Sequence, residues 1–438
     1  MTSPIENPEL KFLGKLPEHW EVVRVRRITQ EHKQGYYTEQ AYIDEGVKLV
    51  RITDIDDSAN ISFENMPFVT ISSKDEQAFK VKEGDFLFAR SGTIGRFGLA
   101  RSSERSVFAS YLIQFRFKHV NSEFLRFVFS SQFFREELVS TLHGGANKNV
   151  HAENIKEQFI AIPPIDMQSA IASFLDRKTA AIDTLITKKE RLIQLLEEKR
   201  TALINQAVTK GLNLNVLMRD SGIPWIGEIP EHWEVVRVRR ITQEHKQGYY
   251  TEQAYIDEGV KLVRITDIDD SANVSFENMP FVTISSKDER AFKVEKGDFL
   301  FARSGTIGRF GLVRSPERSV FASYLIRFRF ENVNLEFLRF VFSSQFFKEG
   351  LISTLHGGAN KNIHAENIKE QFIAIPPSDM QGAIEQVEIA NFIDSESAVI
   401  NKVVDTIREQ IEKLQEYRQS VITAAVTGKI DVREEMAA

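Results

Sequence analysis

Two copies of one sequence organise this chain: Lys15-Leu16-Pro17-Glu18-His19-Trp20-Glu21-Val22-Val23-Arg24 and, 213 residues later, Glu228-Ile229-Pro230-Glu231-His232-Trp233-Glu234-Val235-Val236-Arg237. The repeat extends over residues 17–164 and 230–377, where only 14 of 148 aligned positions differ. Solenoid repeats have units of about 20 to 50 residues. A unit of this length is instead a complete domain, so the sequence predicts two copies of one domain.

Inside each copy, short strands and a helix alternate. In the first copy, apolar and polar residues alternate in the manner of a half-buried strand over Val22–Arg26 and Val47–Ile52, and further strands are expected over Phe86–Arg90 and Val107–Phe117. Phe124–Leu142 has apolar residues three and four apart, which is typical of a helix. We therefore expect a mixed α/β (α+β) fold, with most of the 33 phenylalanines packed in the cores.

Each copy is followed by a segment with the periodicity of a long helix. The first segment has its seam at Ile182, Leu185, Lys189, Leu192, Leu196, Lys199 and Leu203, and the second at Ile400, Val403, Ile407, Gln410, Leu414, Tyr417 and Val421. Spacings of three and four are those of a coiled coil. Because polar residues interrupt both seams, we expect the two helices to pack against each other in antiparallel orientation, as a spacer about 60 Å long.

These patterns predict two near-identical domains separated by two long antiparallel helices that form a coiled-coil spacer. We expect this order: a leader over 1–16, the first domain over 17–164, the central spacer helix over 165–211, a linker over 212–229, the second domain over 230–377, the C-terminal spacer helix over 378–430 and a tail over 431–438.

Composition indicates a cytoplasmic protein. The chain has no cysteine, which is compatible with a reducing compartment. Its first residues lack the basic start and apolar core of a signal peptide, and no run approaches the roughly 18 apolar residues of a membrane span. The net charge is −6, but phosphate binding needs only a local basic face, so charge neither supports nor excludes a DNA partner.

Catalytic and metal motifs are absent from the sequence. Thr427-Gly428-Lys429 lacks the upstream glycine of a phosphate loop, and Gly92, Gly95 and Gly98 do not match the dinucleotide fingerprint. The nine histidines form no zinc-binding pattern, and no Asn/Asp-Pro-Pro-aromatic segment of an adenine methyltransferase occurs. We expect a protein that is not an enzyme and that holds no metal or cofactor.

Antiparallel helices would place the two domains around an approximate twofold axis, the arrangement of identical units that face each other. Duplex DNA has the same local symmetry. A DNA-binding protein with this symmetry is expected to bind two half-sites of inverted sequence, separated by a gap whose length the spacer helices set.

Three motifs, in this order, carry a family resemblance. Pro-Glu-His-Trp-Glu-Val-Val-Arg opens each copy, Gly-Asp-Phe-Leu-Phe-Ala-Arg-Ser-Gly-Thr-Ile-Gly stands in its middle, and Ile-Pro-Pro precedes Ile-Ala-Xaa-Phe-Leu/Ile-Asp at each helix. Over nearly its whole length the chain resembles the DNA specificity subunit of type I restriction-modification enzymes.

The resemblance implies that the two domains are target recognition domains and that the chain is a non-catalytic subunit which binds double-stranded DNA. It also implies two modification (methyltransferase) subunits and restriction (endonuclease/translocase) subunits as partners, with S-adenosylmethionine, ATP and Mg only in those partners. Family members commonly carry two dissimilar domains, whereas these copies predict an interrupted palindrome. A symmetric scaffold that binds protein is the alternative, and a fused methyltransferase is disfavoured by the missing motifs.

Several polar residues are candidates for DNA contact. Arginine reaches guanine with two hydrogen bonds, and hydroxyls, amides and imidazoles bond phosphates or bases. The candidates are Arg90, Ser91, Thr93 and Arg96 in one turn, Asn147, Lys148, Asn149 and His151 in a loop, and Tyr36, with their second-copy equivalents Arg303, Ser304, Thr306, Arg309, Asn360, Lys361, Asn362, His364 and Tyr249.

Each candidate group also has a structural interpretation. The turn is equally a plain hairpin, the loop a solvated segment before a capped helix, and Tyr36 a packing residue. Arg51 is expected to pair internally with the nearby aspartates. Two of the 14 differences, Gln77/Arg290 and Gln114/Arg327, would split the specificity of the halves if they stood at base edges.

Overall fold

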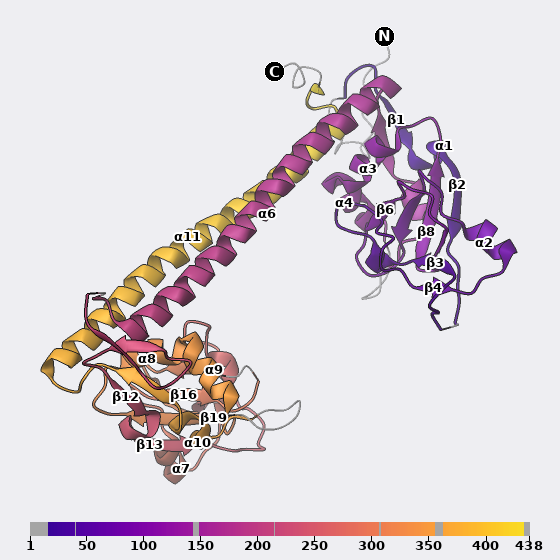
Figure 1. Cartoon of the computed structure of the whole chain (residues 1–438). Helices are drawn as coiled ribbons and strands as arrows, with labels where there is room; N and C mark the ends of the chain where they lie inside the picture. The colour runs from indigo at the N-terminus through magenta and orange to yellow at the C-terminus, as the bar shows by residue number, and fades with distance from the viewer. Residues whose placement is uncertain are drawn as a thin grey trace. The chain divides into compact units, whose positions relative to one another are not determined.

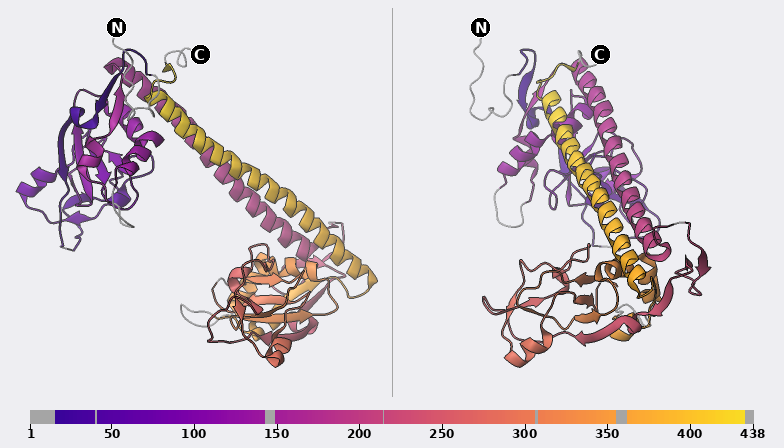
Figure 2. Two further views of the ribbon diagram at one scale, coloured as in Figure 1. Left: turned by 180° about the vertical axis from the view of Figure 1, so that it is seen from behind. Right: turned by 90° about the vertical axis from the view of Figure 1, so that its left-hand side faces the viewer.

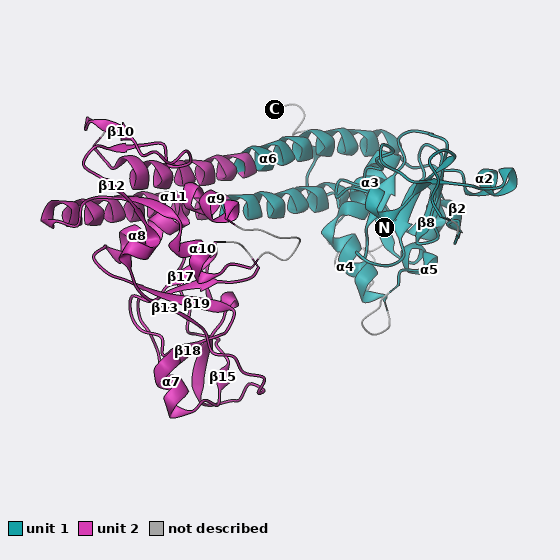
Figure 3. Cartoon of the chain, turned by 60° about the horizontal axis from the view of Figure 1, so that its bottom comes forward, with its two compact units in different colours: residues 1–189, 408–438 teal, residues 190–407 magenta. Residues whose placement is uncertain are grey.

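The same series of strands and helices occurs in both copies of the repeat (Figure 1). The computed structural model describes residues 16–39, 41–142, 149–213, 215–305, 308–354 and 362–432. These residues form two compact units: unit 1, from residues 1–189 and 408–438, and unit 2, from residues 190–407 (Figure 3). Each unit therefore contains one copy of the repeat and part of both long helices.

The first copy contains three small sheets and four helices of five residues or more among its described residues. Its elements are β1 (Glu21–Arg24), α1 (Val25–Ile28), β2 (Thr29–Gln34), β3 (Val47–Val50), β4 (Phe68–Val69), α2 (Ser73–Phe79), β5 (Phe86–Ala89), β6 (Phe97–Leu99), β7 (Ser106–Phe108), β8 (Leu112–Phe117), α3 (Ser122–Ser130), α4 (Gln132–Ser140), α5 (Ala152–Lys156) and β9 (Phe159–Ile162).

The second copy repeats this series with one local change, a 3-10 turn over Val238–Ile241 in place of α1. Its elements are β12 (Glu234–Arg237), β13 (Thr242–Gln247), β14 (Val260–Val263), β15 (Phe281–Val282), α7 (Ser286–Phe292), β16 (Phe299–Ala302), β17 (Phe310–Leu312), β18 (Ser319–Phe321), β19 (Leu325–Phe330), α8 (Leu335–Ser343), α9 (Gln345–Ser353), α10 (Ala365–Lys369) and β20 (Phe372–Ile375).

In each copy the central sheet is antiparallel and has four strands, in the order β2-β8-β5-β6 and β13-β19-β16-β17. A three-stranded sheet, β4-β3-β7 or β15-β14-β18, contains the parallel pair β3/β7 or β14/β18. A two-stranded ladder joins the first and last strands of the copy, β1 with β9 and β12 with β20. This ladder brings the two ends of each copy together, at residues 21–24 with 159–162 and 234–237 with 372–375.

Phenylalanine rings fill the core on one face of the central sheet. Phe86, Phe88 and Phe115 from the strands and Phe129 from α3 are at most 1% exposed. The ring of Phe129 meets Phe86 and Phe88 edge to face, at 5.4 and 5.2 Å between centroids, which is a favoured aromatic geometry. The prediction that these residues pack, and do not stack on bases, is confirmed for this cluster.

Two sequence predictions inside the domain were wrong. The single strand expected over Val107–Phe117 is two strands, β7 and β8, which belong to different sheets and are separated by residues 109–111. The single helix expected over Phe124–Leu142 is α3 and α4, divided at Ser131, whose extended backbone ends the first helix. In both cases the apolar pattern continues through a break that tertiary packing imposes.

Two helices of 46 and 47 residues follow the domains: α6 (Ile165–Lys210) and α11 (Met380–Val426). They lie side by side in both views of Figure 2. Within unit 1, Arg418 Nε donates to Asp183 Oδ1 at 2.8 Å and Lys189 Nζ to Gln410 Oε1 at 2.6 Å. Residue numbers rise along one helix while they fall along the other, so the helices are antiparallel.

The predicted helix seam is right at alternate positions and one residue off at the others. The inward side chains, buried or half-buried, are Ile182, Ile186, Lys189, Ile193, Leu196, Arg200 and Leu203 in α6 and Ile400, Val404, Ile407, Ile411, Leu414, Arg418 and Val421 in α11. Leu185 and Leu192, expected inside, are 42% and 44% exposed, and Val403 and Tyr417 likewise face solvent. Spacings of three-four and four-three both satisfy a heptad, and Leu185 and Leu192 have isoleucines beside them.

The core of each domain is completed by the end of the helix that follows the other domain. Ala207 and Val208, at the end of α6, are buried with Trp233 in the core of unit 2. Ala425 and Val426, at the end of α11, occupy the equivalent place in the core of unit 1. Each unit is therefore built from two separate segments of the chain.

The linker before the second domain explains one of the 14 differences. Unit 2 has Gly350 where the first copy has Glu137. A Cβ atom on Gly350 would lie 3.1 Å from Trp225 Nε1 and 2.6 Å from Gln371 Oε1. Because the linker residue Trp225 takes this space, position 350 has no room for a side chain.

Candidate nucleic-acid interface

A short loop, residues 109–111, brings the predicted contact segments of the first domain together. Tyr36 N donates to Phe108 O at 2.7 Å, Arg90 N to Tyr111 O at 2.9 Å, and Val150 N to Arg90 O at 2.7 Å. These backbone bonds join the tyrosine segment, the arginine turn and the end of the 143–150 loop around one centre. The three segments were chosen independently from sequence, and the fold makes them neighbours.

The second domain repeats this arrangement. Tyr249 N donates to Phe321 O at 2.7 Å, Arg303 N to Tyr324 O at 2.8 Å, and Ile363 N to Arg303 O at 2.7 Å. Each bond has the same partners as in the first copy, 213 residues later. The backbone around the candidate site is therefore the same in both domains.

Glycine permits the close approach at the start of this cluster. A Cβ atom on Gly35 would lie 2.1 Å from Ala109 O, and the same holds for Gly248 and Ala322 O. No side chain fits at that distance, so the chain passes directly against the 109–111 loop. This contact sets the positions of the tyrosines that follow Gly35.

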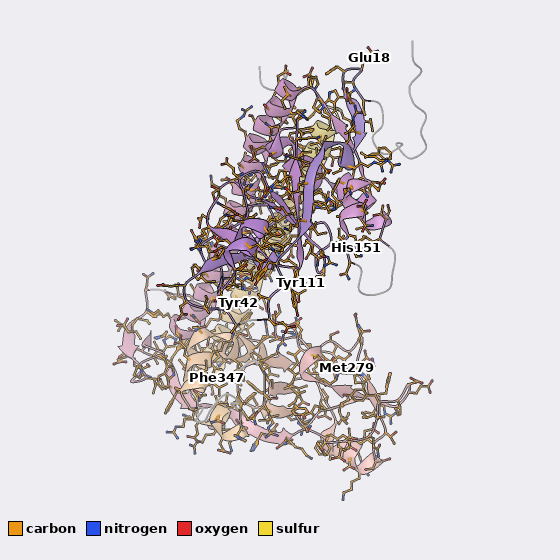
Figure 4. The ribbon with its side chains drawn as sticks, turned by 90° about the vertical axis from the view of Figure 1, so that its right-hand side faces the viewer. Glu18, Tyr42, Tyr111, His151, Met279 and Phe347 are labelled. Atoms are coloured by element: carbon orange, nitrogen blue, oxygen red, sulfur yellow. The ribbon has the colours of Figure 1, made fainter. Side chains whose placement is uncertain are left out.

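Three tyrosines of each domain present their rings to solvent. Tyr37, Tyr42 and Tyr111 are 57–65% exposed in the first domain, and their second-copy equivalents are exposed to the same extent. In the view of Figure 4, Tyr111 lies between Tyr42 and His151. Tyrosine combines a flat apolar ring with a hydrogen-bonding hydroxyl, so it suits an interface with bases and phosphates. A hydrogen bond to Glu39, at 2.7 Å, raises the pKa of Tyr37 and keeps its hydroxyl protonated.

In the second domain these tyrosines border a pocket of about 570 Å3. Its lining includes Tyr250, Tyr255 and Tyr324, together with Arg264 and Thr266. Arg264 Nη2 donates to Asp267 Oδ1 at 2.8 Å, as Arg51 does to Asp54 at 2.8 Å in the first domain. The predicted internal ion pair of Arg51 is confirmed, and the hydrogen bond that Arg51 donates to Asp54 raises the pKa of the arginine.

The two arginines at the ends of the turn differ in their freedom. Arg96 Nη2 pairs with Asp57 Oδ1 at 2.6 Å, and Arg309 Nη2 with Asp270 Oδ1 at 2.8 Å. Arg90 is half-buried, and within the described residues no hydrogen bond or ion pair engages its guanidinium. Among the described residues the guanidinium of Arg90 is thus free to contact an anion or a base edge, and the backbone N–H of Arg90 bonds Tyr111 O at 2.9 Å.

The remaining candidates have mixed surroundings. Thr93, Asn149 and His151 are exposed, as are Asn362 and His364, whereas Ser91 and Ser304 are half-buried. His151 and His364 stand at the N-terminal caps of α5 and α10. Tyr36 and Tyr249 pack on Phe79 and Phe292, with ring centroids 5.6 and 5.5 Å apart. Asn147, Lys148, Thr306, Asn360 and Lys361 lie outside the described residues.

One predicted source of different specificity is wrong. Gln114 and Arg327 are 1% and 3% exposed. Arg327 Nη1 donates to Lys293 O at 2.8 Å, inside the domain. Both side chains are therefore removed from any base edge, while Gln77 and Arg290 are exposed on α2 and α7.

Sequence reasoning missed Tyr111 and Tyr324, because they lie where one continuous strand was expected. The sequence signal is Ala109-Ser110-Tyr111, three residues that interrupt the large apolar side chains between Phe108 and Leu112. Among the described residues there is neither a cluster of three or more His, Asp or Glu side chains suited to a metal nor a helix apolar enough to span a membrane.

Comparison with protein families gives one match, and it covers both halves of the chain. The family described as "Type I restriction modification DNA specificity domain" matches residues 17–195 and 230–413. The chain is 23% identical to the type I restriction enzyme MjaVIII specificity subunit of Methanocaldococcus jannaschii, over 96% of this chain and 95% of that protein. It is also 23% identical to the EcoKI specificity subunit of Escherichia coli K12, over 95% and 90%.

Solved structures show the same fold at low sequence identity. A chain from a study titled as the structural basis of complex assembly and conformational transition of the type I R-M system aligns with a TM-score of 0.70, at 15% identity, over 95% of this chain and all of that one. The HsdS subunit from Thermoanaerobacter tengcongensis aligns with a TM-score of 0.55, at 15% identity, over 95% and 98%.

Proposed function

Because the chain belongs to the family of type I restriction-modification DNA specificity proteins, and is thus a non-catalytic specificity subunit, we propose that it reads a bipartite, interrupted-palindromic DNA site. On that site it positions two modification subunits and the restriction subunits. S-adenosylmethionine, ATP and Mg belong to those partners in this proposal. Its DNA partner places the chain in the cytoplasm.

The proposal of a palindromic site rests on one observation: the candidate contact segments of the two domains have nearly the same sequence. The 14 differences leave residues 34–42, 90–96 and 109–111 untouched, and within 149–151 they change only Val150, which is Ile363 in the second copy. Both of these side chains are 1% exposed. Since identical exposed groups on the same backbone present the same donors and acceptors, the two domains read the same bases.

The two long helices make equivalent contacts with each other inside each unit. Arg418 bonds Asp183 at 2.8 Å in unit 1, and Arg200 bonds Asn401 at 2.8 Å in unit 2. These pairs occupy equivalent positions of the two helices, at an offset of 218. Equivalent helix contacts beside two near-identical domains support the proposal that the two half-sites are inverted copies of one sequence.

Exposed apolar residues at the start of each long helix provide surfaces for the modification subunits. In unit 2, Met380, Ile384 and Val387 at the beginning of α11 are 83%, 43% and 42% exposed. In unit 1, Ile165 at the beginning of α6 is 57% exposed. Apolar residues gathered on a helix mark protein contacts, so we place one modification subunit at each helix-domain junction.

Methylation mapping tests the proposal directly. In a host with the complete system, we expect modified adenines in a gapped site whose two halves are inverted copies of each other. Two unrelated half-sites would show that the reading segments lie elsewhere.

A binding assay separates this function from a protein-binding scaffold. The chain, purified with its modification subunit, should retard duplex DNA, and its affinity should fall steeply as salt rises. Failure to bind DNA at low salt would leave the scaffold as the better account.

A further inference from the structure

In unit 2 a cleft of about 860 Å3 lies between the second domain and the two long helices. Helix α6 contributes Arg200, helix α11 contributes Asp394 and Asn401, and the domain contributes side chains from α8, α9 and neighbouring loops. Five basic and four acidic side chains line this cleft: Arg200, Arg309, Arg314, Arg339, Lys348, Asp269, Asp270, Glu336 and Asp394.

All four acids of the cleft already have partners. Asp270 pairs with Arg309 at 2.8 Å, and Asp394 pairs with Arg339 at 2.6 Å. Glu336 pairs with Arg314 at 2.7 Å and with Arg339 at 2.9 Å, and Asp269 accepts hydrogen bonds from the backbone of Ser271 and Asn273. Three of these acids pair with Arg309, Arg314 and Arg339, so the lining has a net charge of +1 and, among the described residues, leaves two cations without an acid partner.

Those two cations are Arg200 and Lys348. Among the residues that the structure describes, Arg200 Nη1 donates only to the neutral amide of Asn401, at 2.8 Å. Within the described part of the chain, Lys348 forms neither an ion pair nor a side-chain hydrogen bond. A net positive charge and two cations without an acid partner favour an anion in this cleft, and guanidinium and ammonium groups both bind phosphate.

The equivalent place in unit 1 differs by one charge. Arg418 and Arg135 stand where unit 2 has Arg200 and Lys348, but Asp183 replaces Asn401 and pairs with Arg418. The pKa of Arg135 is lowered, first because burial removes water from its guanidinium and then because Arg418 repels it. The two cationic positions are thus close enough to interact, and the difference is that Arg418 of unit 1 pairs with the carboxylate of Asp183, whereas Arg200 of unit 2 bonds the neutral amide of Asn401.

The cleft adjoins the candidate reading surface. Arg309, on its wall, ends the turn that begins at Arg303, and Arg303 donates its backbone N–H to Tyr324 O at 2.8 Å. A duplex that contacts this turn brings its phosphates toward the cleft. Resting on the function proposed above, we infer that the cleft of unit 2 binds a backbone phosphate of the DNA, held by Arg200 and Lys348.

Salt dependence of DNA binding tests the inference, because each phosphate contact adds about one to the slope of log affinity against log salt. The chain in complex with its modification subunit is titrated with duplex DNA at several salt concentrations. We expect Lys348→Gln and Asn401→Asp each to reduce the slope by about one. Lys348→Arg, which installs the residue that unit 1 has at this position, should preserve it.

A reciprocal change in unit 1 is the matched control. Asp183→Asn frees Arg418 in the way that Asn401 leaves Arg200 free, so it should raise the slope by up to about one. Thermal unfolding of every variant checks that the folded state is retained. Wild-type slopes in both Lys348→Gln and Asn401→Asp, with normal unfolding, would overturn the inference.

Two further outcomes separate the inference from the function on which it rests. If the wild-type complex does not bind DNA at all, the proposed function fails. Wild type could instead bind DNA while the salt slopes of the variants stay unchanged, and inorganic phosphate alone could raise the unfolding temperature only when Lys348 is present. In that case the cleft binds free phosphate, and its assignment to a DNA phosphate is refuted.

Discussion

Replacing Val208 by alanine should loosen the second recognition domain and leave the first unchanged. Val208 belongs to α6, the helix that follows the first domain in sequence, yet its side chain is 0% exposed in the core of unit 2. Val426, at the end of α11, has the equivalent place in the core of unit 1 and is 1% exposed. The two substitutions therefore form a matched pair with opposite targets.

The magnitude follows from what the substitution removes. Two methyl groups leave a fully buried site, which costs about 1.6 kcal/mol at about 0.8 kcal/mol per group. The unfilled cavity raises the cost to about 2–3 kcal/mol, since a packed core relaxes only in part. Because about 1.4 kcal/mol is a factor of ten, amide protection in the affected unit should fall about 30- to 150-fold.

Hydrogen exchange read by mass spectrometry resolves the two units. Peptides across β8 and β19 carry Gln114 and Arg327 at equivalent positions, so their masses distinguish the near-identical domains. We expect Val208→Ala to speed exchange in β19 but not in β8, and Val426→Ala to do the reverse. Faster exchange of β8 in Val208→Ala would refute the assignment of each helix end to the opposite domain.

Three other outcomes are expected. Tyr111→Ala and Tyr324→Ala should each weaken DNA binding by about 1–3 kcal/mol, by the same amount and without loss of stability. Binding titrations measure this, with Tyr37→Phe as the control. Unequal losses of affinity would mean that the two domains read different bases. Glu385→Ala should destabilise unit 2 by about 1–3 kcal/mol in thermal unfolding, since Trp233 Nε1 then loses its acceptor at 3.0 Å, whereas Glu385→Gln keeps one. Burial raises the pKa of Glu336, but Arg314 and Arg339 lower it by more, so the net pKa is depressed below 4.5. The stability that the ionised carboxylate contributes is therefore present above that pH and is lost on acidification. Glu336→Gln should make the unfolding temperature fall less steeply on the acid side in pH-dependent melting.

The repeat and the helices could be predicted because their signals are local and long. A near-identical copy of 148 residues and heptad spacing over some forty more leave few alternatives. The phase of the seam could not be fixed in the same way, since Leu185 and Ile186 are both apolar neighbours in sequence. Only packing against the second helix and the domain makes Ile186 the inward residue, with Leu185 left 42% exposed.

The residue types of the candidate site could be predicted from sequence, but the 109–111 loop that joins its segments could not. Arginine and hydroxyl groups on a glycine turn indicate a surface for nucleic acid, and in the structure Thr93 is exposed and Arg90 half-buried. The loop that joins the segments depends on hydrogen bonds between residues far apart, such as Tyr36 with Phe108 and Val150 with Arg90. No local pattern reports such bonds, so Tyr111 was concealed inside an apparently continuous strand.

Two differences between the halves arise where the linker or helix α11 contacts the second domain. Gly350 makes room for Trp225 of the linker, and Glu385, near the start of α11, bonds Trp233 Nε1, while Trp20 Nε1 has no hydrogen-bond partner among the described residues. Both changes lie outside the segments proposed to read bases. Contacts with the linker and with α11 therefore account for these two differences.

Base contacts that are the same in both domains and a phosphate contact that only unit 2 makes should depend differently on salt. Direct base contacts depend little on salt, whereas a phosphate contact weakens as counterions compete for the site. If Asn401 leaves Arg200 free in unit 2 and Asp183 neutralises Arg418 in unit 1, the two half-sites should be bound with different affinity at low salt. Raising the salt should remove that difference, because the surplus phosphate contact disappears while the identical base contacts remain.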